Sequence, residues 1–114
     1  MPDPVSLSIT GLGALSALGC GVEDHHGSVM AGEVPFGKLD QLLGMDSPHA
    51  KRTAAWISDR KLLLNRKWSP ATMAALQVAR QAVAEAGWTA ADLHDAALVV
   101  GTSRGNAAGW LGPW

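Results

Sequence analysis

Cysteine is almost absent from this chain of 114 residues, since Cys20 is the only one. With a single thiol no disulfide can form within the chain, which excludes the small secreted scaffolds that several disulfides hold together. The cytoplasm, a reducing compartment, is therefore the location we expect. Tyrosine is missing altogether, and five tryptophans supply most of the aromatic side chains.

Positive charge is missing from the amino-terminal part, where the first Lys or Arg is Lys38. Residues 4–22 are uncharged, but hydroxyl side chains and four glycines interrupt their apolar residues. A secretory signal needs a basic start and an apolar stretch, and a membrane helix needs about 20 mostly apolar residues in a row. We therefore predict folded structure in this region and no contact with a membrane.

Charge of either sign is also scarce, at 17% of residues and a net charge of −1. Such a chain has no long-range field that would attract nucleic acid or an anionic membrane. Its hydrophobic content of 47% is that of a globular protein and excludes intrinsic disorder. The length suits one small domain, which we place over residues 1–114.

Apolar and hydroxyl side chains alternate over residues 5–10, as in a strand with one apolar face. We expect the glycines that follow to permit close backbone approach and positive φ angles; they are Gly11, Gly13, Gly19 and Gly21. Residues 22–31 fit a short helix that ends at Gly32 and has two acidic residues in its first turn. Residues 33–58 show no sustained period and are expected to be a connection with one helical turn.

The clearest expected element is a helix over residues 69–86. Ser69 can cap its amino terminus, Pro70 suits its first turn, and Gly87 stands where a left-handed residue ends a helix. We expect Trp88 to make the apolar contact that often accompanies such an end. An apolar stripe with helical spacing indicates that the helix is largely buried; it consists of Leu76, Ala79, Val83 and Ala86.

After a polar link at residues 92–95, residues 96–100 form a continuous apolar run that Gly101 ends. Runs of this kind are typical of a central parallel strand that is covered on both faces. Strand, long helix and strand in this order predict a right-handed β-α-β crossover. The predicted fold class is therefore α/β, with a parallel-containing sheet.

Three segments, in order, resemble the amino-terminal region of the β-ketoacyl synthases, the condensing enzymes of fatty acid and polyketide assembly. The segments are residues 9–19, the helix at residues 74–88 with its alanine-rich ending at residues 82–87, and residues 98–105. The resemblance implies a thiolase-like fold that this chain forms only in part. It also implies a role in acyl transfer by decarboxylative Claisen condensation. Arg104 departs from the family, which more often has a small or apolar residue in this loop.

The resemblance also implies which groups this chain lacks. Enzymes of the family form a thioester on a cysteine and use two histidines to decarboxylate and condense, and all three residues lie downstream of the region that resembles this chain. Cys20 lies in a glycine-rich turn and does not correspond to that nucleophile. We therefore predict no catalytic residue here, no condensation by the chain alone, and no cofactor.

Four histidines remain as candidates for acid–base or metal chemistry: His25, His26, His49 and His94. The adjacent pair would point to different faces of a helix, and no His pair has helical spacing. With no second cysteine, too few ligands are available for a metal ion. We predict surface histidines in contact with solvent and no metal site.

Gly11 and Gly13 after a strand raise an alternative, a dinucleotide-binding loop. The full fingerprint needs glycine or alanine at position 16, where Ser16 stands, and an acidic residue about 20 residues later. The loop at residues 101–105 resembles a phosphate-binding loop but lacks its lysine. Neither alternative accounts for the sequence as well as the resemblance does.

Residues 51–67 hold six basic residues against one acidic residue. The resemblance places basic residues just before the long helix, where ketosynthases meet an acidic acyl carrier protein. The predicted carrier-protein surface consists of Arg60, Lys61, Arg66 and Lys67. Complementary charges there would steer encounter and orient a weak complex. An ordinary solvated face is the alternative, and nucleic acid is not expected because no nucleic-acid-binding module is recognisable.

Two hypotheses for function remain open. In the first, the chain is the amino-terminal portion of a β-ketoacyl synthase, has an architectural role and packs on a homodimer partner. In the second, it is a non-catalytic binding module or chain-length-factor-like subunit that contacts an acyl carrier protein or forms a heterodimer with a catalytic ketosynthase. In both, a sheet edge and the side chains of Trp110 and Trp114 need a cover, supplied by a partner or by this chain's own surface.

Overall fold

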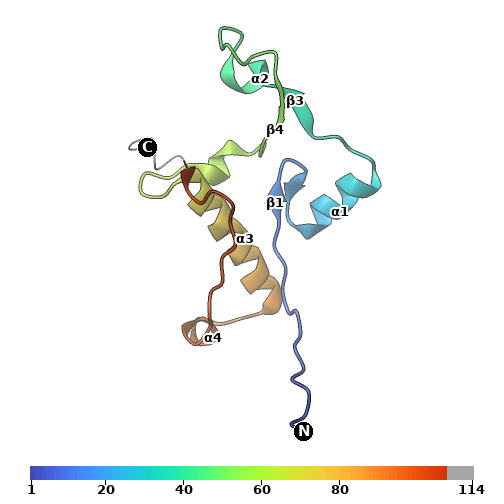
Figure 1. Cartoon of the computed structure of the whole chain (residues 1–114), viewed down its shortest axis with the longest axis vertical. Helices are drawn as coiled ribbons and strands as arrows, with labels where there is room; N and C mark the ends of the chain where they lie inside the picture. The colour runs from blue at the N-terminus through green and yellow to red at the C-terminus, as the bar shows by residue number, and fades with distance from the viewer. Residues whose placement is uncertain (108–114) are drawn as a thin grey trace.

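The computed structural model describes residues 1–107, drawn in colour in Figure 1. Trp110 and Trp114, for which a cover was expected, lie outside the described residues. Short elements connected by long irregular segments make up the described part of the chain. In order they are β1 (Leu15–Ser16), β2 (Gly19–Cys20), α1 (Val22–Met30), β3 (Phe36–Lys38), α2 (Asp40–Leu43), β4 (Thr53–Ala55), the 3-10 helix η1 (Arg60–Leu63), α3 (Pro70–Ala86) and α4 (Ala90–His94).

All strand pairing within residues 1–107 is antiparallel. Strands β1 and β2 form one two-stranded sheet and β3 and β4 form another. The predicted parallel-containing sheet, its β-α-β crossover and its partial thiolase-like architecture are therefore wrong. Neither residues 5–10 nor residues 96–100 form a strand. Figure 1 shows these two segments passing on either side of α3.

The expected close approach of the glycine backbone is confirmed at α3. A Cβ atom on Gly11 would overlap the carbonyl oxygen of Ala82, and one on Gly13 would overlap that of Val78. Only glycine lets the chain lie directly on the helix backbone at these two positions. The segment after residue 10 is therefore held against α3.

Side chains of α3 also accept hydrogen bonds from backbone N–H groups that a neighbouring strand would need as partners. The Leu12 N–H donates to Glu85 Oε2 at 2.6 Å, and the Ala14 N–H donates to Gln81 Oε1 at 2.8 Å. A strand forms only where backbone groups pair with another strand. The backbone that follows residues 5–10 is therefore already hydrogen-bonded to α3 and does not pair with a strand. This is one physical reason why the predicted sheet does not form.

The capping residues at both ends of α3 are as predicted. The Ser69 side chain accepts a hydrogen bond from the Thr72 N–H at 3.2 Å, and Pro70 begins the helix. Gly87 has a φ of 68°, and the Trp88 N–H donates to the Val83 carbonyl at 3.2 Å. These bonds are the features of a capped amino terminus and of a left-handed carboxyl-terminal end.

The expectation that α3 is largely buried is wrong, because none of its residues is buried. Leu76 and Ala79 of the predicted stripe are exposed, whereas Val78 and Ala82 are half-buried under the glycine segment. The stripe stays open since residues 96–100 do not cover it as a strand would. Leu93 of α4 lies beside it across a cavity of about 310 Å³. Thr10, Gly11 and Trp88 line a second, smaller cavity with its Val83 and Ala86.

The remaining elements were predicted in part. Helix α1 and its two acidic first-turn residues are confirmed, with Gly32 at a φ of 69° beyond its end. The single helical turn expected within residues 33–58 is α2, but the pairing of β3 with β4 was not predicted. The expected polar link at residues 92–95 is largely helix α4, whose capping box joins Thr89 and Asp92.

The core is very small. Only Ala50, Leu63 and Ser69 are buried among the described residues. The accessible surface is 9382 Å², whereas a folded chain of 11.9 kDa exposes about 6,000 Å². The radius of gyration is 17.9 Å, against about 13 Å for a compact chain of this length. The described chain is therefore open and elongated.

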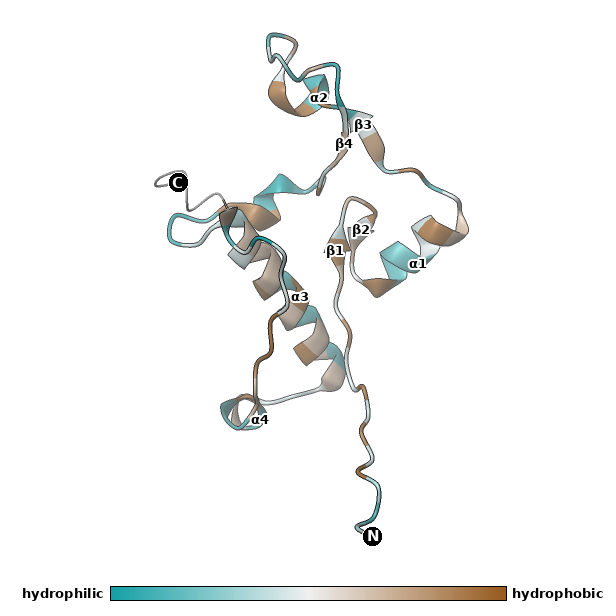
Figure 2. Ribbon diagram, viewed as in Figure 1, coloured by the Kyte–Doolittle hydropathy of each residue, from teal (hydrophilic) through white to brown (hydrophobic). Residues whose placement is uncertain are grey.

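Much of the extra surface is apolar. Figure 2 shows hydrophobic residues along segments 5–10 and 96–100. Six of their side chains are between 71% and 93% exposed: Val5, Leu7, Ile9, Leu98, Val99 and Val100. Monomeric soluble proteins rarely expose apolar surface of this extent. Within the described residues no helix is long and apolar enough to cross a membrane.

Candidate functional site

The basic surface predicted from sequence begins at η1. Leu63 is 6% exposed and anchors η1 against α3. The Asp59 side chain caps η1 by accepting a hydrogen bond from the Lys61 N–H at 3.1 Å. With Leu63 turned inward, the side chains of Arg60 and Lys61 are exposed to solvent.

The second half of the basic surface lies in the turn between η1 and α3. Asn65 Oδ1 accepts hydrogen bonds from the backbone N–H groups of Lys67 at 2.7 Å and Trp68 at 3.0 Å. Lys67 Nζ lies 5.0 Å from the centre of the Trp68 ring, within the range of a cation–π interaction. Arg66 is exposed beside it. The four predicted residues thus occupy one short exposed connection that leads into the positive amino terminus of α3.

A polar pair that the sequence did not indicate joins the β1–β2 hairpin to α1. His25 Nε2 lies 2.7 Å from Ser16 Oγ, and His25 Nδ1 lies 2.6 Å from the Gly21 carbonyl oxygen. A carbonyl oxygen can only accept, so Nδ1 carries the proton and donates it there. In the neutral imidazole Nε2 is then the acceptor, and the Ser16 hydroxyl donates to it.

This geometry corrects one expectation for the histidines. His25 is half-buried and hydrogen-bonded at both ring nitrogens, so its prediction as a solvated surface residue is wrong. His26, His49 and His94 are exposed, as expected. No spacing motif joins residues 16 and 25. The usable signal was the pair of glycines at positions 19 and 21, whose φ angles of 147° and 101° turn the chain back on itself.

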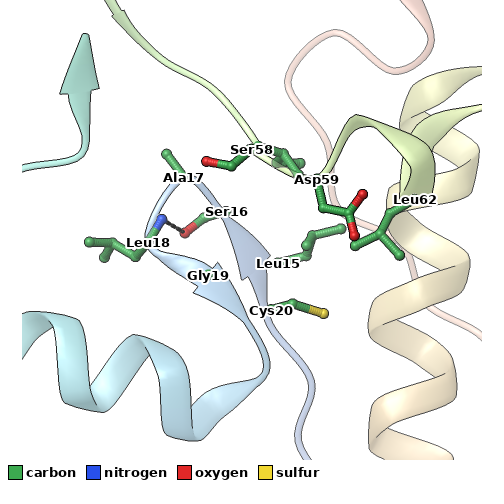
Figure 3. Close-up of a pocket in the computed structure, with 10 residues that line it drawn as sticks. Leu15, Ser16, Ala17, Leu18, Gly19, Cys20, Ser58, Asp59 and Leu62 are labelled. Carbon is green, nitrogen blue, oxygen red and sulfur yellow. Dashed lines mark hydrogen bonds between the residues drawn. The ribbon is translucent and has the colours of Figure 1, made fainter.

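A cavity of about 220 Å³ lies between this hairpin and the segment that leads into η1 (Figure 3). The hairpin supplies residues 15–20, and Ile57, Ser58, Asp59 and Leu62 lie opposite. Ser16 also lines a wider groove of about 580 Å³, which reaches Trp56 and Arg60. The groove therefore connects the hairpin to the first cation of the basic surface.

Cys20 lines the cavity but has no partner that would activate it among the described residues. Its thiol is exposed, and its sulfur accepts a hydrogen bond from Gln81 Nε2 at 3.2 Å. The Cys20 N–H donates to Asp24 Oδ2 at 3.2 Å, which ties β2 to α1. Over residues 1–107, no group of three or more His, Cys, Asp or Glu residues could hold a metal ion.

One carboxyl group has a shifted pKa. The Thr89 backbone N–H donates to Asp92 Oδ2 at 2.7 Å, and the Thr89 hydroxyl donates to the same oxygen at 2.9 Å. These two bonds, the backbone one foremost, hold the pKa of Asp92 below its ordinary value of 3.8. Asp92 caps α4 and lies outside the surfaces described above.

Comparisons with known proteins gave no match. A scan against protein-family models, a search of curated proteins and a search of solved structures each found nothing similar to this chain.

Proposed function

We propose that this chain is the amino-terminal structural portion of a β-ketoacyl synthase-like protein that serves fatty acid or polyketide assembly. It does not condense acyl groups alone, because the cysteine and the two histidines that such chemistry needs have no counterpart here. Its role is to supply a scaffold and a surface for an acyl carrier protein.

The observation that carries this proposal is the contact between two of the segments that resemble the family. Gly11 and Gly13 belong to the first segment; Gly11 meets Ala82 and Gly13 meets Val78, and both partners belong to the second segment. They meet with no room for a Cβ atom on either glycine. These two segments lie about 70 residues apart in the sequence, yet their backbones are in direct contact. Since neither segment needs the other for its local structure, the contact supports the interpretation that both patterns come from one family.

The third segment also reaches α3. Val100, Gly101, Thr102 and Gly105 line a cavity of about 340 Å³ together with Ala71, Thr72, Ala75 and Asn106. The stretches that carry the resemblance therefore gather around one helix. This arrangement supports a scaffold whose remaining surface is completed by other polypeptide.

A specific observation favours a second candidate function, that of a non-catalytic, chain-length-factor-like subunit. The excess of roughly 3,400 Å² over the surface of a compact chain is larger than the share of about 1,000–2,500 Å² that one chain buries in an obligate subunit interface. A stoichiometric complex with a catalytic ketosynthase, seen by size-exclusion chromatography with light scattering, would support this candidate. Failure to bind such a chain would leave the carrier-protein surface as the only partner site of the proposal.

The carrier-protein surface is tested by charge reversal. Replacing Arg66 and Lys67 with Glu should raise the Kd for an acidic acyl carrier protein about 10-fold at low salt, because favourable long-range attraction becomes repulsion. The matched control is the pair Lys51→Glu and Arg52→Glu, which changes the net charge equally but lies outside the predicted surface. Fluorescence anisotropy gives both values. Equal Kd values for the two double variants would refute the proposed surface.

A further inference from the structure

We propose that Ser16 and His25 form a nucleophile–base pair that takes up short acyl groups from esters or thioesters. This site lies on the β1–β2 hairpin and does not depend on the function proposed above. No residue of the basic surface takes part in the chemistry.

The two hydrogen bonds of His25 give it the arrangement of a general base. The Gly21 carbonyl accepts from Nδ1 at 2.6 Å, which orients the ring and, in the neutral imidazole, leaves the proton on Nδ1. The free lone pair on Nε2 accepts from the Ser16 hydroxyl at 2.7 Å. A nucleophile bonded to a base, and that base oriented by a third group, is the geometry that activates serine.

Backbone and cavity complete the site. The Leu18 N–H donates to Ser16 Oγ at 3.1 Å, which helps to hold that oxygen in place beside His25. The cavity of about 220 Å³ beside Ser16 has room for a short acyl chain. Apolar side chains make up part of its lining and suit an uncharged acyl chain, and Ser58 and Asp59 give it a polar side; the apolar ones are Leu15, Ala17, Leu18, Ile57 and Leu62.

The reaction proceeds in two balanced steps. Ser16 Oγ attacks the acyl carbonyl carbon while His25 Nε2 takes the hydroxyl proton. The bond from that carbon to the alkoxide or thiolate breaks, and the leaving group takes the proton from Nε2, so the acyl group remains as an ester on Ser16. Water then attacks the ester with His25 as base, which releases the acid and restores the hydroxyl.

The test uses a fluorophosphonate probe on the full chain, with the modified peptide located by mass spectrometry. Such a probe reacts with an activated serine: the Oγ–P bond forms, the P–F bond breaks, and fluoride leaves. We expect an adduct on Ser16 in the wild-type protein and at least about 100-fold slower labelling in His25→Gln, which keeps a hydrogen-bonding side chain but cannot take the proton.

The matched control is Ser28→Ala. The Ser28 hydroxyl donates to the Leu18 carbonyl at 3.0 Å, so this change also removes a bond between α1 and the hairpin but leaves the base in place. Its labelling rate should equal that of the wild type. If the circular dichroism signal of the helices is lost in His25→Gln, the test uses His25→Ala, labelled with and without added imidazole. Labelling of Ser16 that imidazole restores supports the proposal. Absence of an adduct on Ser16, equal rates in wild type and His25→Gln, or no rescue by imidazole would each overturn it.

Discussion

At the scale of single residues, the two glycines that touch α3 are the most demanding positions in the chain. Replacing Gly11 with Ala places a Cβ against the Ala82 carbonyl oxygen, where the helix backbone cannot give way. We expect a loss of about 1–3 kcal/mol in the free energy of unfolding, the usual cost of overpacking. Urea denaturation measures it.

The control for this prediction is Gly27→Ala in the exposed middle of α1. A Cβ at Gly27 meets nothing within 4 Å. This variant should therefore be more stable than wild type by about 0.5–1 kcal/mol, because alanine is the better helix former. A Gly11→Ala variant as stable as Gly27→Ala would show that the amino-terminal segment does not rest on α3.

The capping box of α4 predicts a dependence on pH. Because Thr89 holds the pKa of Asp92 below 3.8 in the folded chain, the carboxylate stabilises α4 above that value. This contribution is lost as the pH falls below 3.8 through the folded pKa. Thr89→Val keeps the backbone N–H but removes the hydroxyl, so the pKa of Asp92 should rise part of the way towards 3.8.

Carboxyl resonances followed by NMR during a pH titration measure this shift. Thr72→Val serves as the control, since it removes a hydroxyl near the cap of α3 and should leave Asp92 unchanged. A wild-type pKa of Asp92 at or above 3.8 would contradict the capping geometry.

The residue scale also shows what sequence can reveal. The close approach of the backbone at Gly11 and Gly13 was predictable, because only glycine lets two backbones lie in direct contact. The bond between Ser16 and His25 was not, since nine residues separate them and the hairpin geometry alone brings them together. The need for a particular residue type at one position can be predicted from sequence. Whether two side chains meet across a turn depends on backbone angles, which the sequence does not show directly.

At the scale of elements, α3 was predictable because its signals are local. Ser69 is 1% exposed, and its hydroxyl bonds to the Thr72 N–H. Ser69→Ala should lower the free energy of unfolding by about 1 kcal/mol, whereas Ser69→Gly should cost only a few tenths. Thermal denaturation by circular dichroism compares the two. Equal stability of wild type and Ser69→Ala would mean that the cap contributes nothing.

Strands were not predictable in the same way, because a strand exists only with a partner. Residues 5–10 and 96–100 have suitable side-chain patterns, yet their backbone has no strand beside it within the described residues. The pairing of β3 with β4, in contrast, arises in a segment without a clear apolar period. Tertiary context decides such cases more than propensity does.

At the scale of the whole molecule, the exposed apolar residues of segments 5–10 and 96–100 are the reason to expect that this chain binds another polypeptide. Leu7 is 89% exposed in the middle of an apolar face. Leu7→Asp should weaken self-association because a charge opposes burial of that face. Asp3→Asn, near the same end but outside the alternating segment, is the control and should have no such effect. Light scattering at a fixed protein concentration compares them, and equal apparent masses would count against this segment as a contact surface.

The most direct test is sedimentation velocity of the full chain from micromolar to millimolar concentration. Since the described structure leaves roughly 3,400 Å² more surface open than a compact chain of this size, we predict species heavier than 11.9 kDa that grow with concentration. A single compact monomer at every concentration would contradict the claim that this chain needs another polypeptide to complete its fold.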